Sequence, residues 1–394
     1  MKICISGAGV AGPTLAYWLE RSGHKPVLVE HAADFRAGGY VIDFWGTGYT
    51  IAERMGVLED VRARGYSIEE VRFVDADGTK AAAFSAKVFG RMTGGRYTSL
   101  PRGDLAECIY MAVQDKVETV FGDSISAIDM GDEGVAVRFE SGARRDFDLV
   151  IGADGLHSNV RRLLFGPEVD YERKLGFYVA AFEVSGYTPR DENVYLSHAV
   201  PGRTIFRFAL RGGTTLFLFV FEAGRMTGPE PHAMAGRKAA LRDIFSDMKW
   251  ECPDILGVME DADDIYFDRV SQIEMPAWSK SRAMLVGDAA ACVSLLAGEG
   301  TGLAMTQAYV LAGELQRAGG DHRAAFAAHE ARLRPFLLAK QKSARAFASS
   351  FAPKTALGIG VRNLVTNLLR VPFVANLAIG PSLKDDFDLP DYRL

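Results

Sequence analysis

The chain has 394 residues, of which 48% are apolar and 24% are charged, and its formal net charge is −5. This length favours two domains over a single core, and the composition is that of an ordinary soluble globular protein. The mild negative charge argues against nucleic acid as a main partner. No uninterrupted apolar stretch reaches the roughly 18 residues of a membrane-spanning helix, so we expect no stable membrane insertion.

The chain opens on a short apolar strand, Lys2 to Ser6, rather than on a pattern typical of a secretory leader. Its four cysteines form no CxxC pair, so we expect buried thiols in a reducing compartment. These cysteines are Cys4, Cys108, Cys252 and Cys292. The expected location is therefore the cytoplasm.

A glycine-rich turn follows the first strand, and Gly7-Ala8-Gly9-Val10-Ala11-Gly12 fits the GxGxxG pattern. A helix is predicted after it, and a second strand ends at Glu30. Glycines let backbone amides approach a pyrophosphate, and the start of a helix favours an anion. Glu30 lies close to the spacing of about 20 residues expected for an acid that binds adenosine ribose hydroxyls. This βαβ unit predicts a site for FAD or NAD.

Two later segments repeat the strand–turn–helix pattern. Residues 148–155 end a strand near Asp154, and Ser158 is placed to cap the helix that follows, with Arg161 in its first turn. Residues 283–290 end another strand at Asp288. A carboxylate at the carboxyl end of a strand lies in the ligand crevice of an α/β sheet and suits sugar or ribityl hydroxyls. A plainer interpretation, in which each aspartate caps its turn, stays open.

A second glycine-rich segment, Gly298-Glu299-Gly300-Thr301-Gly302, opens a long helix predicted to reach about Leu315. The amides and the dipole at the start of this helix could stabilise the N1–C2=O edge of a flavin, which becomes negative on reduction. Three ligand-type turns in one chain make FAD a better prediction than NAD.

The region between these turns predicts a β-hairpin, because residues 204–210 and 214–222 are extended runs joined by Gly212-Gly213. The second run is apolar on both faces, so both faces should be covered. Either helices cover one face while the other walls a pocket, or both faces are core. Arg207 either orients a substrate anion or is solvated. The pocket candidates are Phe44, Trp45, Tyr49, Phe206, Arg207, Phe208, Phe217 and Phe219.

Towards the C-terminus, Pro335 is expected to interrupt a helix over about residues 322–348. The apolar stretch 355–380 then predicts a helix packed over the body of the protein. A helix on a membrane surface is the less favoured alternative, because its polar residues are few and mostly uncharged.

With these motifs in place, the sequence resembles the flavoprotein monooxygenases of the p-hydroxybenzoate hydroxylase type over nearly its whole length. The resemblance rests on the first glycine turn, on Asp154-Gly155, on Gly287-Asp288 and on residues 100–105, where the family places an arginine that contacts FAD. Arg102 is the counterpart here. Residues 12–19, 35–43 and 278–288 are similar to the branch of tetracycline-inactivating monooxygenases and polyketide hydroxylases, which carries an apolar C-terminal helix beside the substrate entrance.

The motifs and the resemblance together give a set of expected cofactor-binding residues. They are Gly7, Gly9, Ala11, Gly12, Glu30, Arg36, Arg102, Asp154, Asp288, Gly298, Gly300 and Thr301.

The resemblance implies an α/β fold in which a Rossmann-like FAD-binding domain is interleaved with a β-sheet substrate domain and followed by C-terminal helices. The FAD-binding domain is expected to comprise residues 1–72, 97–175 and 270–340. The substrate domain is expected over residues 73–96 and 176–269, and residues 341–394 should form a helical segment over the substrate entrance.

The resemblance also implies an activity. NADPH or NADH reduces FAD, and O2 then forms a C4a-hydroperoxyflavin that hydroxylates an aromatic ring or performs a Baeyer–Villiger oxidation. The substrate is expected to be bulky and aromatic or polyketide-like, tetracyclines included, and the protein a monomer or weak homodimer. No second GxGxxG predicts a separate nicotinamide domain, and no HExxH pattern or paired Cys/His spacing predicts a metal site.

The chain departs from its apparent relatives after Asp288. Ala291 stands where they carry histidine or tyrosine, and residues 293–296 stand where they carry prolines near the reactive edge of the flavin. Glu299 replaces a frequent glutamine, and Gly302 a frequent asparagine. A flavin-dependent dehydrogenase or reductase of the same fold, without oxygen insertion, therefore remains an alternative. A non-catalytic small-molecule binder is a further one, while a halogenase is disfavoured because no WxWxIP pattern occurs.

Overall fold

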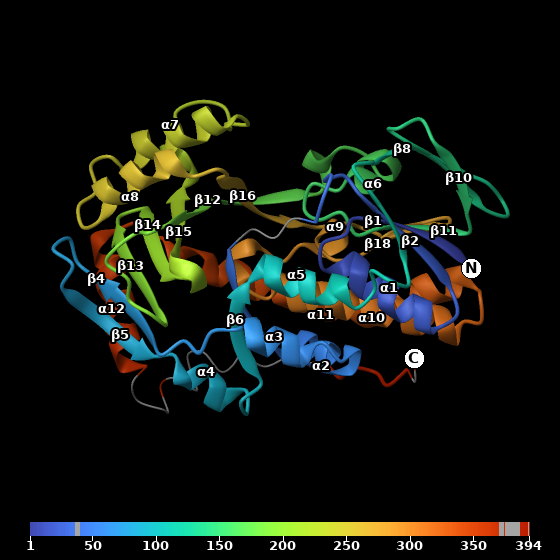
Figure 1. Cartoon of the computed structure of the whole chain (residues 1–394), viewed down its shortest axis with the longest axis horizontal. Coiled ribbons are helices and arrows are strands. Elements are labelled where there is room, and N and C mark those ends of the chain that lie inside the picture. The colour runs from blue at the N-terminus through green and yellow to red at the C-terminus, as the bar shows by residue number, and fades with distance from the viewer. Residues whose placement is uncertain (36–39, 370–373, 375–386, 393) are drawn as a thin grey trace.

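The computed structural model describes residues 1–35, 40–369, 374, 387–392 and 394. Within these residues, four β-sheets and twelve α-helices form two bodies, one around β1, β2, β11 and β18 and the other around β12 to β15 (Figure 1). The helices are α1 (Ala11–Arg21), α2 (Gly46–Met55), α3 (Leu58–Arg64), α4 (Lys87–Met92), α5 (Arg102–Met111), α6 (Asn159–Leu164), α7 (Met234–Phe245), α8 (Cys252–Val258), α9 (Asp288–Ala291), α10 (Gly300–Arg317), α11 (His322–Phe351) and α12 (Ala356–Leu368).

The first body is built on a mostly parallel sheet. Its strands in spatial order are β17 (Ser279–Lys280), β18 (Ala283–Leu285), β11 (Leu149–Gly152), β1 (Lys2–Ser6), β2 (Lys25–Glu30) and β7 (Glu118–Phe121). The central strands are short buried apolar runs, as expected where helices cover both faces of a parallel sheet. Ser6 pairs with Val29 on one side and Gly152 on the other, so these strands end at one common edge.

Helices α1 and α10 pack together over this sheet, and the rings of Trp18 and Tyr309 meet edge to face with centroids 5.1 Å apart. Helix α2 crosses α10 at two glycines. A Cβ atom on Gly48 would lie 2.5 Å from the Cα of Gly302, so only glycine permits this approach. Next to the crossing, the hydroxyls of Thr47 and Thr306 lie 2.8 Å apart. The start of α10 is thereby fixed against α2.

Helix α11 runs unbroken from His322 to Phe351, so the interruption expected at Pro335 is wrong. A proline inside a helix removes one backbone hydrogen bond and crowds the preceding turn. Leu333 and Leu337, on either side of it, are fully buried, and Ala344 is buried further along the same helix. We infer that this packing outweighs the local cost of the proline.

The second body is a seven-stranded, mainly antiparallel sheet. Its strands in spatial order are β16 (Tyr266–Ile273), β12 (Glu172–Ser185), β15 (Thr214–Glu222), β14 (Arg203–Ala209), β13 (Val194–Val200), β4 (Glu70–Val74) and β5 (Lys80–Ser85). The predicted hairpin is confirmed, because β14 and β15 pair antiparallel around a turn at Arg211–Gly213. Gly212 and Gly213 have φ angles of 70° and 78°, which favour glycine.

Alternate residues of β15 point to opposite faces of this sheet. On the outer face, Phe217, Phe219 and Phe221 are fully buried in a cluster with residues of α7 and α8. On the inner face, Leu216, Leu218 and Val220 belong to other clusters, one of which includes Leu295 and Leu296 beyond Asp288. The inner face is thus the one turned to the first body, and Figure 1 shows α7 and α8 over the opposite side.

Two smaller sheets complete the fold. One is the antiparallel ribbon of β3 (Val41–Trp45) and β6 (Tyr97–Pro101), and the other contains β8 (Ile125–Met130), β9 (Val135–Phe139) and β10 (Arg144–Phe147). The predicted interleaved α/β architecture is confirmed. The expected boundaries at residues 72/73, 175/176 and 269/270 fall inside the continuous strands β4, β12 and β16, so that division stays a prediction.

Helix α12 lies beside β4 and β5 (Figure 1) with its polar side towards the sheet. The Arg362 guanidinium stands 4.2 Å from the centre of the Phe73 ring, and the Asn367 side chain bonds the backbone of Ala81 and Ala83. Leu357, by contrast, is 79% exposed. The predicted helix in this apolar stretch is thus present over 356–368, and the described residues contain no helix long and apolar enough to cross a membrane.

Near the C-terminus, Tyr392 inserts into the first body and is buried. Its hydroxyl donates to Glu314 Oε1 over 2.6 Å, and the Arg317 guanidinium lies 4.4 Å from its ring centre. A Cβ atom on Gly313 would lie 2.2 Å from the ring. Gly313 is therefore the gap in α10 that accepts this tyrosine.

Candidate functional site

The first glycine turn packs directly on the turn that follows β11. Gly7 has a φ of +104°, and a Cβ atom there would lie 2.5 Å from the carbonyl oxygen of Ala153. At Gly12, a Cβ atom would lie 1.9 Å from the carbonyl oxygen of Gly7. Both positions therefore require glycine, and Ala11 begins α1 directly beyond the turn.

Glu30 lies at the end of β2, beside this turn. Its two carboxylate oxygens accept the backbone amides of Ala8 over 2.8 Å and Ala32 over 2.9 Å. Each oxygen has a further lone pair. The arrangement is compatible with the predicted role towards ribose hydroxyls, and it shows that Glu30 also fixes the glycine turn.

Asp154 is held within its own turn. It accepts the Ser158 hydroxyl, the Val160 amide over 3.0 Å and the Ser6 hydroxyl over 3.4 Å, and burial raises the pKa of its carboxyl. Ser158 accepts the Arg161 amide over 3.0 Å, which confirms the predicted helix cap. This geometry supports the turn-cap interpretation of Asp154, and its contact with FAD stays a prediction.

Four other predicted cofactor residues meet at the carboxyl edge of the parallel sheet. A Cβ atom on Gly9 would lie 3.6 Å from Arg102 Nη2, and one on Gly300 would lie 3.7 Å from Asp288 Oδ1. Burial raises the pKa of Asp288, while the nearby charge of Arg102 opposes that shift. We call this arrangement of Gly9, Arg102, Asp288 and Gly300 the crevice.

The start of α10 borders the crevice, with Gly298 at a φ of +70° just before it and Thr301 in its first turn. Glu299 pairs with Lys340 of α11 over 2.7 Å, and both side chains are largely buried. Gln341 Nε2 donates to the carbonyls of Ile273 over 2.8 Å and Cys292 over 2.9 Å. Helix α11 thus contacts the segment between Asp288 and α10, in which the sequence departs from the family it resembles.

Within that segment, Ser294 has a φ of 137° and a ψ of 140°, a backbone conformation rare outside glycine. Its hydroxyl accepts the Leu296 amide over 3.3 Å. The segment in which the sequence is expected to depart from the family it resembles therefore contains a strained turn.

The crevice fits FAD. Gly9 carries no side chain where a pyrophosphate would approach, the Arg102 guanidinium supplies positive charge beside it, and the first-turn amides of α1 lack intrahelical acceptors. Asp288 lies at the edge where sugar-type hydroxyls bind in such folds. Arg36, also expected to bind cofactor, lies outside the described residues.

Phe217 and Phe219 do not wall a pocket, and that prediction is wrong. Both are fully buried on the outer face, where the Phe219 ring meets Phe245 of α7 edge to face at 4.8 Å. Because both faces of β15 are apolar, the sequence pattern could not tell which one helices would cover.

Both interpretations of Arg207 are wrong as well. The side chain is only 3% exposed on the outer face. It pairs with Asp191 and, over 2.8 Å, with Glu251, and it also donates to the Pro189 carbonyl. Arg207 is therefore neither solvated nor turned to the inner face. It ties the sheet to the start of α8.

The remaining pocket candidates fall into three groups. Phe206 and Phe208 are on the inner face, whereas Tyr49 is fully buried in the core of the first body. Phe44 and Trp45 line a narrow cavity next to the start of α10, which Asp43, Thr47, Glu299, Gly302 and Leu303 complete.

Two features near the site were missed by sequence reasoning. Asp43 interrupts an apolar strand, and that interruption was the available signal. His157 bridges Asp268 over 3.1 Å and Glu168 over 3.0 Å, joining the loop after β11 to β16. No local pattern predicts the His157–Asp268 bridge, since the two residues are 111 positions apart in the sequence.

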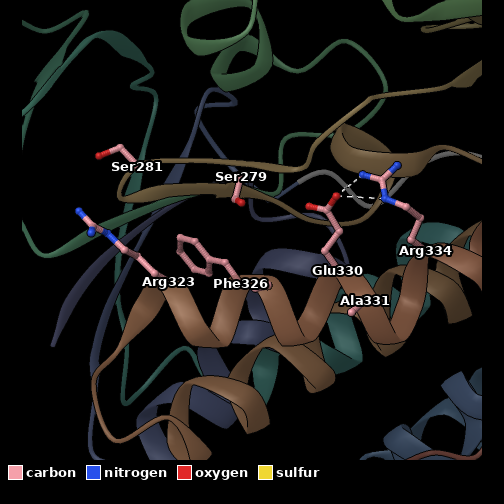
Figure 2. A pocket seen from close by; sticks show the side chains of 8 residues that line it. Ser279, Ser281, Arg323, Phe326, Glu330, Ala331 and Arg334 are labelled. Carbon is pink, nitrogen blue, oxygen red and sulfur yellow. Dashed lines mark hydrogen bonds and ion pairs between the residues drawn. The ribbon is translucent and has the colours of Figure 1, made fainter.

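A larger groove of about 610 Å³ lies elsewhere, between β17 and α11 (Figure 2). Figure 2 shows Glu330 and Arg334 paired along α11, while Arg323 and Ser281 lie towards the other end of the groove. Arg334 also covers the Trp278 ring at 4.7 Å and donates to the Met275 carbonyl. None of the groove residues belongs to the crevice, and we assign it no function.

Comparisons with known proteins agree with this geometry. The family model described as "FAD binding domain" matches residues 1–325. A flavin-dependent monooxygenase of Legionella longbeachae is 34% identical, covering 100% of this chain and 98% of its own length. Another flavin-dependent monooxygenase, from an unknown prokaryotic organism, is 36% identical over 86% of this chain and 87% of its own.

Among solved structures, the crystal structure of tetracycline destructase Tet(55) is similar at a TM-score of 0.84 and 32% identity, covering 99% of this chain and 98% of that one. The resemblance to monooxygenases of the p-hydroxybenzoate hydroxylase type, and to their tetracycline-inactivating branch, is confirmed. The chain belongs to the flavin-dependent monooxygenases of the FAD-binding-domain family.

Proposed function

We propose that this enzyme uses NADH or NADPH and O2 to insert one oxygen atom into a bulky aromatic or polyketide-like molecule, tetracyclines among them. The insertion is a ring hydroxylation or a Baeyer–Villiger oxidation. The observation that carries the proposal is the common boundary of the two bodies. Leu295 and Leu296, which lead from the crevice to α10, pack on the apolar inner face of the substrate sheet.

Each part of this boundary has a task in the proposal. Arg102 and the start of α1 would hold the pyrophosphate, while Asp288 would bind sugar-type hydroxyls. When bound, FAD supplies electron transfer and oxygen activation. Phe206 and Leu218, which keep part of their surface accessible on the inner face, would position an apolar ring system and exclude water from it.

The partners and setting form part of the same proposal. The nicotinamide cofactor would bind transiently, and the protein would act in the cytoplasm as a monomer or weak homodimer. The four cysteines are all free and buried, which suits a reducing compartment.

The decisive test is turnover of purified, FAD-loaded protein with tetracycline and a panel of phenols and anthracyclines under ¹⁸O-labelled O2. We expect NAD(P)H oxidation coupled to a product that contains one labelled oxygen atom. Oxidation of NAD(P)H that yields only peroxide, with every panel member unchanged, would contradict the proposal.

A flavin-dependent reductase without oxygen insertion is the second candidate. The strained turn at Ser294 and the Glu299–Lys340 pair favour it, because they replace the segment that relatives use near the flavin. Reduction of a panel compound without incorporation of label would identify this activity.

A further inference from the structure

Helix α12 has its polar side turned to the protein and its apolar side turned to solvent. On the inward side, Thr366 is buried and Asn367 bonds the backbone of β5. On the other side, five apolar positions spaced as one face of a helix are between 43% and 79% exposed. We call this set the outward face of α12, and its members are Leu357, Val361, Leu364, Val365 and Leu368.

This orientation is the reverse of the usual one, in which a helix on a sheet buries its apolar side. Eight large apolar side chains are exposed among the described residues, and five of them belong to the outward face. The other three are dispersed over the molecule, at Met111, Val169 and Leu338. Because contiguous exposed apolar patches mark interaction surfaces, the outward face calls for an apolar partner.

The charge carried by α12 and its approach is positive. Residues 352–369 contain two cations and neither Asp nor Glu. Lys354 pairs with Glu222 over 2.7 Å, whereas no carboxylate of the described residues pairs with Arg362. Arg362 donates only to the neighbouring Asn363 side chain, and its Nη1 is buried without an acceptor. The helix therefore carries a positive charge that the described residues do not balance.

Helix α4 adds cations at the end of α12. The two helices meet where Leu369 packs against Phe84 and Val88. Helix α4 contains no acidic residue, and its exposed Lys87 and Arg91 join no ion pair of the described residues. By its own residues α12 has too little charge for a membrane-surface helix, but in the fold α4 supplies charge beside it.

Two partners would cover an apolar face of this kind, and the charges favour one of them. In a symmetric contact between two copies, the same surface meets itself, so the cations of α4 and α12 would approach cations and find no carboxylate on these helices. A bilayer with anionic lipids instead offers an apolar region to the leucines and phosphates to the cations.

We propose that the outward face of α12 docks the protein reversibly on an anionic phospholipid bilayer, with the helix in the plane of the surface and Lys87 and Arg91 at the headgroups. Docking requires no turnover, so it goes beyond the proposed oxygen insertion and does not depend on it. Because α12 covers the β5 edge of the seven-stranded sheet (Figure 1), this sheet would lie beside the bilayer, where apolar molecules concentrate.

The test mixes FAD-loaded protein with vesicles of phosphatidylcholine, either alone or with added phosphatidylglycerol, and separates bound protein by flotation. We expect about tenfold more bound protein with the anionic lipid, and less binding as salt is added. Val361→Asp should abolish binding, because it places a charge in the apolar face. Val169→Asp is the matched control, since Val169 is also exposed but follows Glu168 near the opposite edge strand, β16.

Two further measurements separate the apolar contact from the charge. The double variant Lys87→Gln, Arg91→Gln should lose most of the preference for phosphatidylglycerol, whereas Arg144→Gln, at an exposed position of β10, should keep it. The native cysteines are buried, so a polarity-sensitive dye can be attached selectively to Leu364→Cys. Its emission should move to shorter wavelength on anionic vesicles, and the same dye on Val169→Cys should not respond.

Three outcomes would overturn the proposal. They are a parent that binds neither vesicle, a Val361→Asp variant that binds as the parent does, and a dye at position 364 that does not respond to vesicles. A dimer of the parent in light scattering that Val361→Asp dissociates, without vesicle binding, would assign the face to a second copy. Vesicle binding by an enzyme that never incorporates labelled oxygen would refute the proposed function and leave the docking surface standing.

Discussion

The two faces of the seven-stranded sheet differ although they alternate along the same strands. On the outer face, the aromatic side chains of β15 are fully buried under α7 and α8, and the cations of β14 are paired. On the inner face, Phe206, Leu218 and Tyr195 keep part of their surface accessible. The outer face is a completed core, whereas the inner face has surface left for a further molecule. Substitutions on the two faces should therefore have different consequences.

The largest effect on stability is expected from Phe219→Ala on the outer face. Removing this fully buried ring leaves a cavity beside Phe245, and the free energy of unfolding should fall by about 4 kcal/mol. Urea unfolding measures this loss of stability. The FAD content of the folded fraction should be the same in the variant and the parent.

The matched control is its neighbour Leu218→Ala, on the inner face, which should cost about 2 kcal/mol. This variant should instead raise the KM for an aromatic substrate. Equal losses of stability in the two variants, with equal KM values, would remove the distinction between the faces.

Arg207→Met should have the next largest effect, about 3 kcal/mol at neutral pH, because Asp191 and Glu251 lose their buried partner. Burial already raises the pKa of Glu251, and loss of the cation raises it further. Protonation of Glu251 at lower pH removes the unpaired charge. The difference in unfolding free energy between parent and variant should therefore shrink as the pH falls from neutrality. Thermal unfolding of both proteins across this range checks the sign, and a deficit that does not vary with pH would contradict it.

The smallest effect is expected from His157→Gln, at the contact between the first body and Asp268 of β16. Hydrogen bonds to Asp268 and Glu168 raise the pKa of His157 from 6.5 to about 10. A raised pKa stabilises the folded state fully below about pH 6.5, and this contribution disappears as the pH rises through 10.

Because the His157 ring is 53% exposed, solvent limits the gain to less than about 1 kcal/mol. The unfolding free energies of parent and variant should converge between these two pH values. A difference that widened with pH would show that the histidine is neutral in the folded protein.

Local signals in the sequence were sufficient to predict the glycine turns and the helix cap. They were not sufficient to predict which face of β15 the helices cover. Gly7 and Gly12 were predictable because a close approach permits no side chain, and Ser158 because a cap needs only its own helix. The direction of Phe217 and Phe219 depends on α7 and α8, which lie elsewhere in the sequence and could equally have covered the other side. The partners of Arg207 are likewise separated from it along the chain.

The candidate site also contains one part that the sequence predicts and one part that it does not. The cofactor residues of the crevice lie in recognisable turns, so their proximity was expected from the common edge of parallel strands. The carboxylate of Asp43, by contrast, accepts the hydroxyls of Tyr97 and Tyr195, which two different strands supply. An interruption at Pro335 is predicted because the local cost of a proline is visible in the sequence, while the packing that outweighs this cost is not.

The contact between Tyr392 and Gly313 has a consequence for the order in which the protein can be completed during synthesis. Strand β1 and helix α1 leave the ribosome before α10, yet the far end of α10, which packs on α1, lacks one of its aromatic partners until residue 392 is made. The first body is thus completed by residues that lie far apart in the sequence. A nascent chain therefore carries an unfilled, ring-sized gap beside Tyr309 until residue 392 has been made, so that gap can close only after α10 has been synthesised.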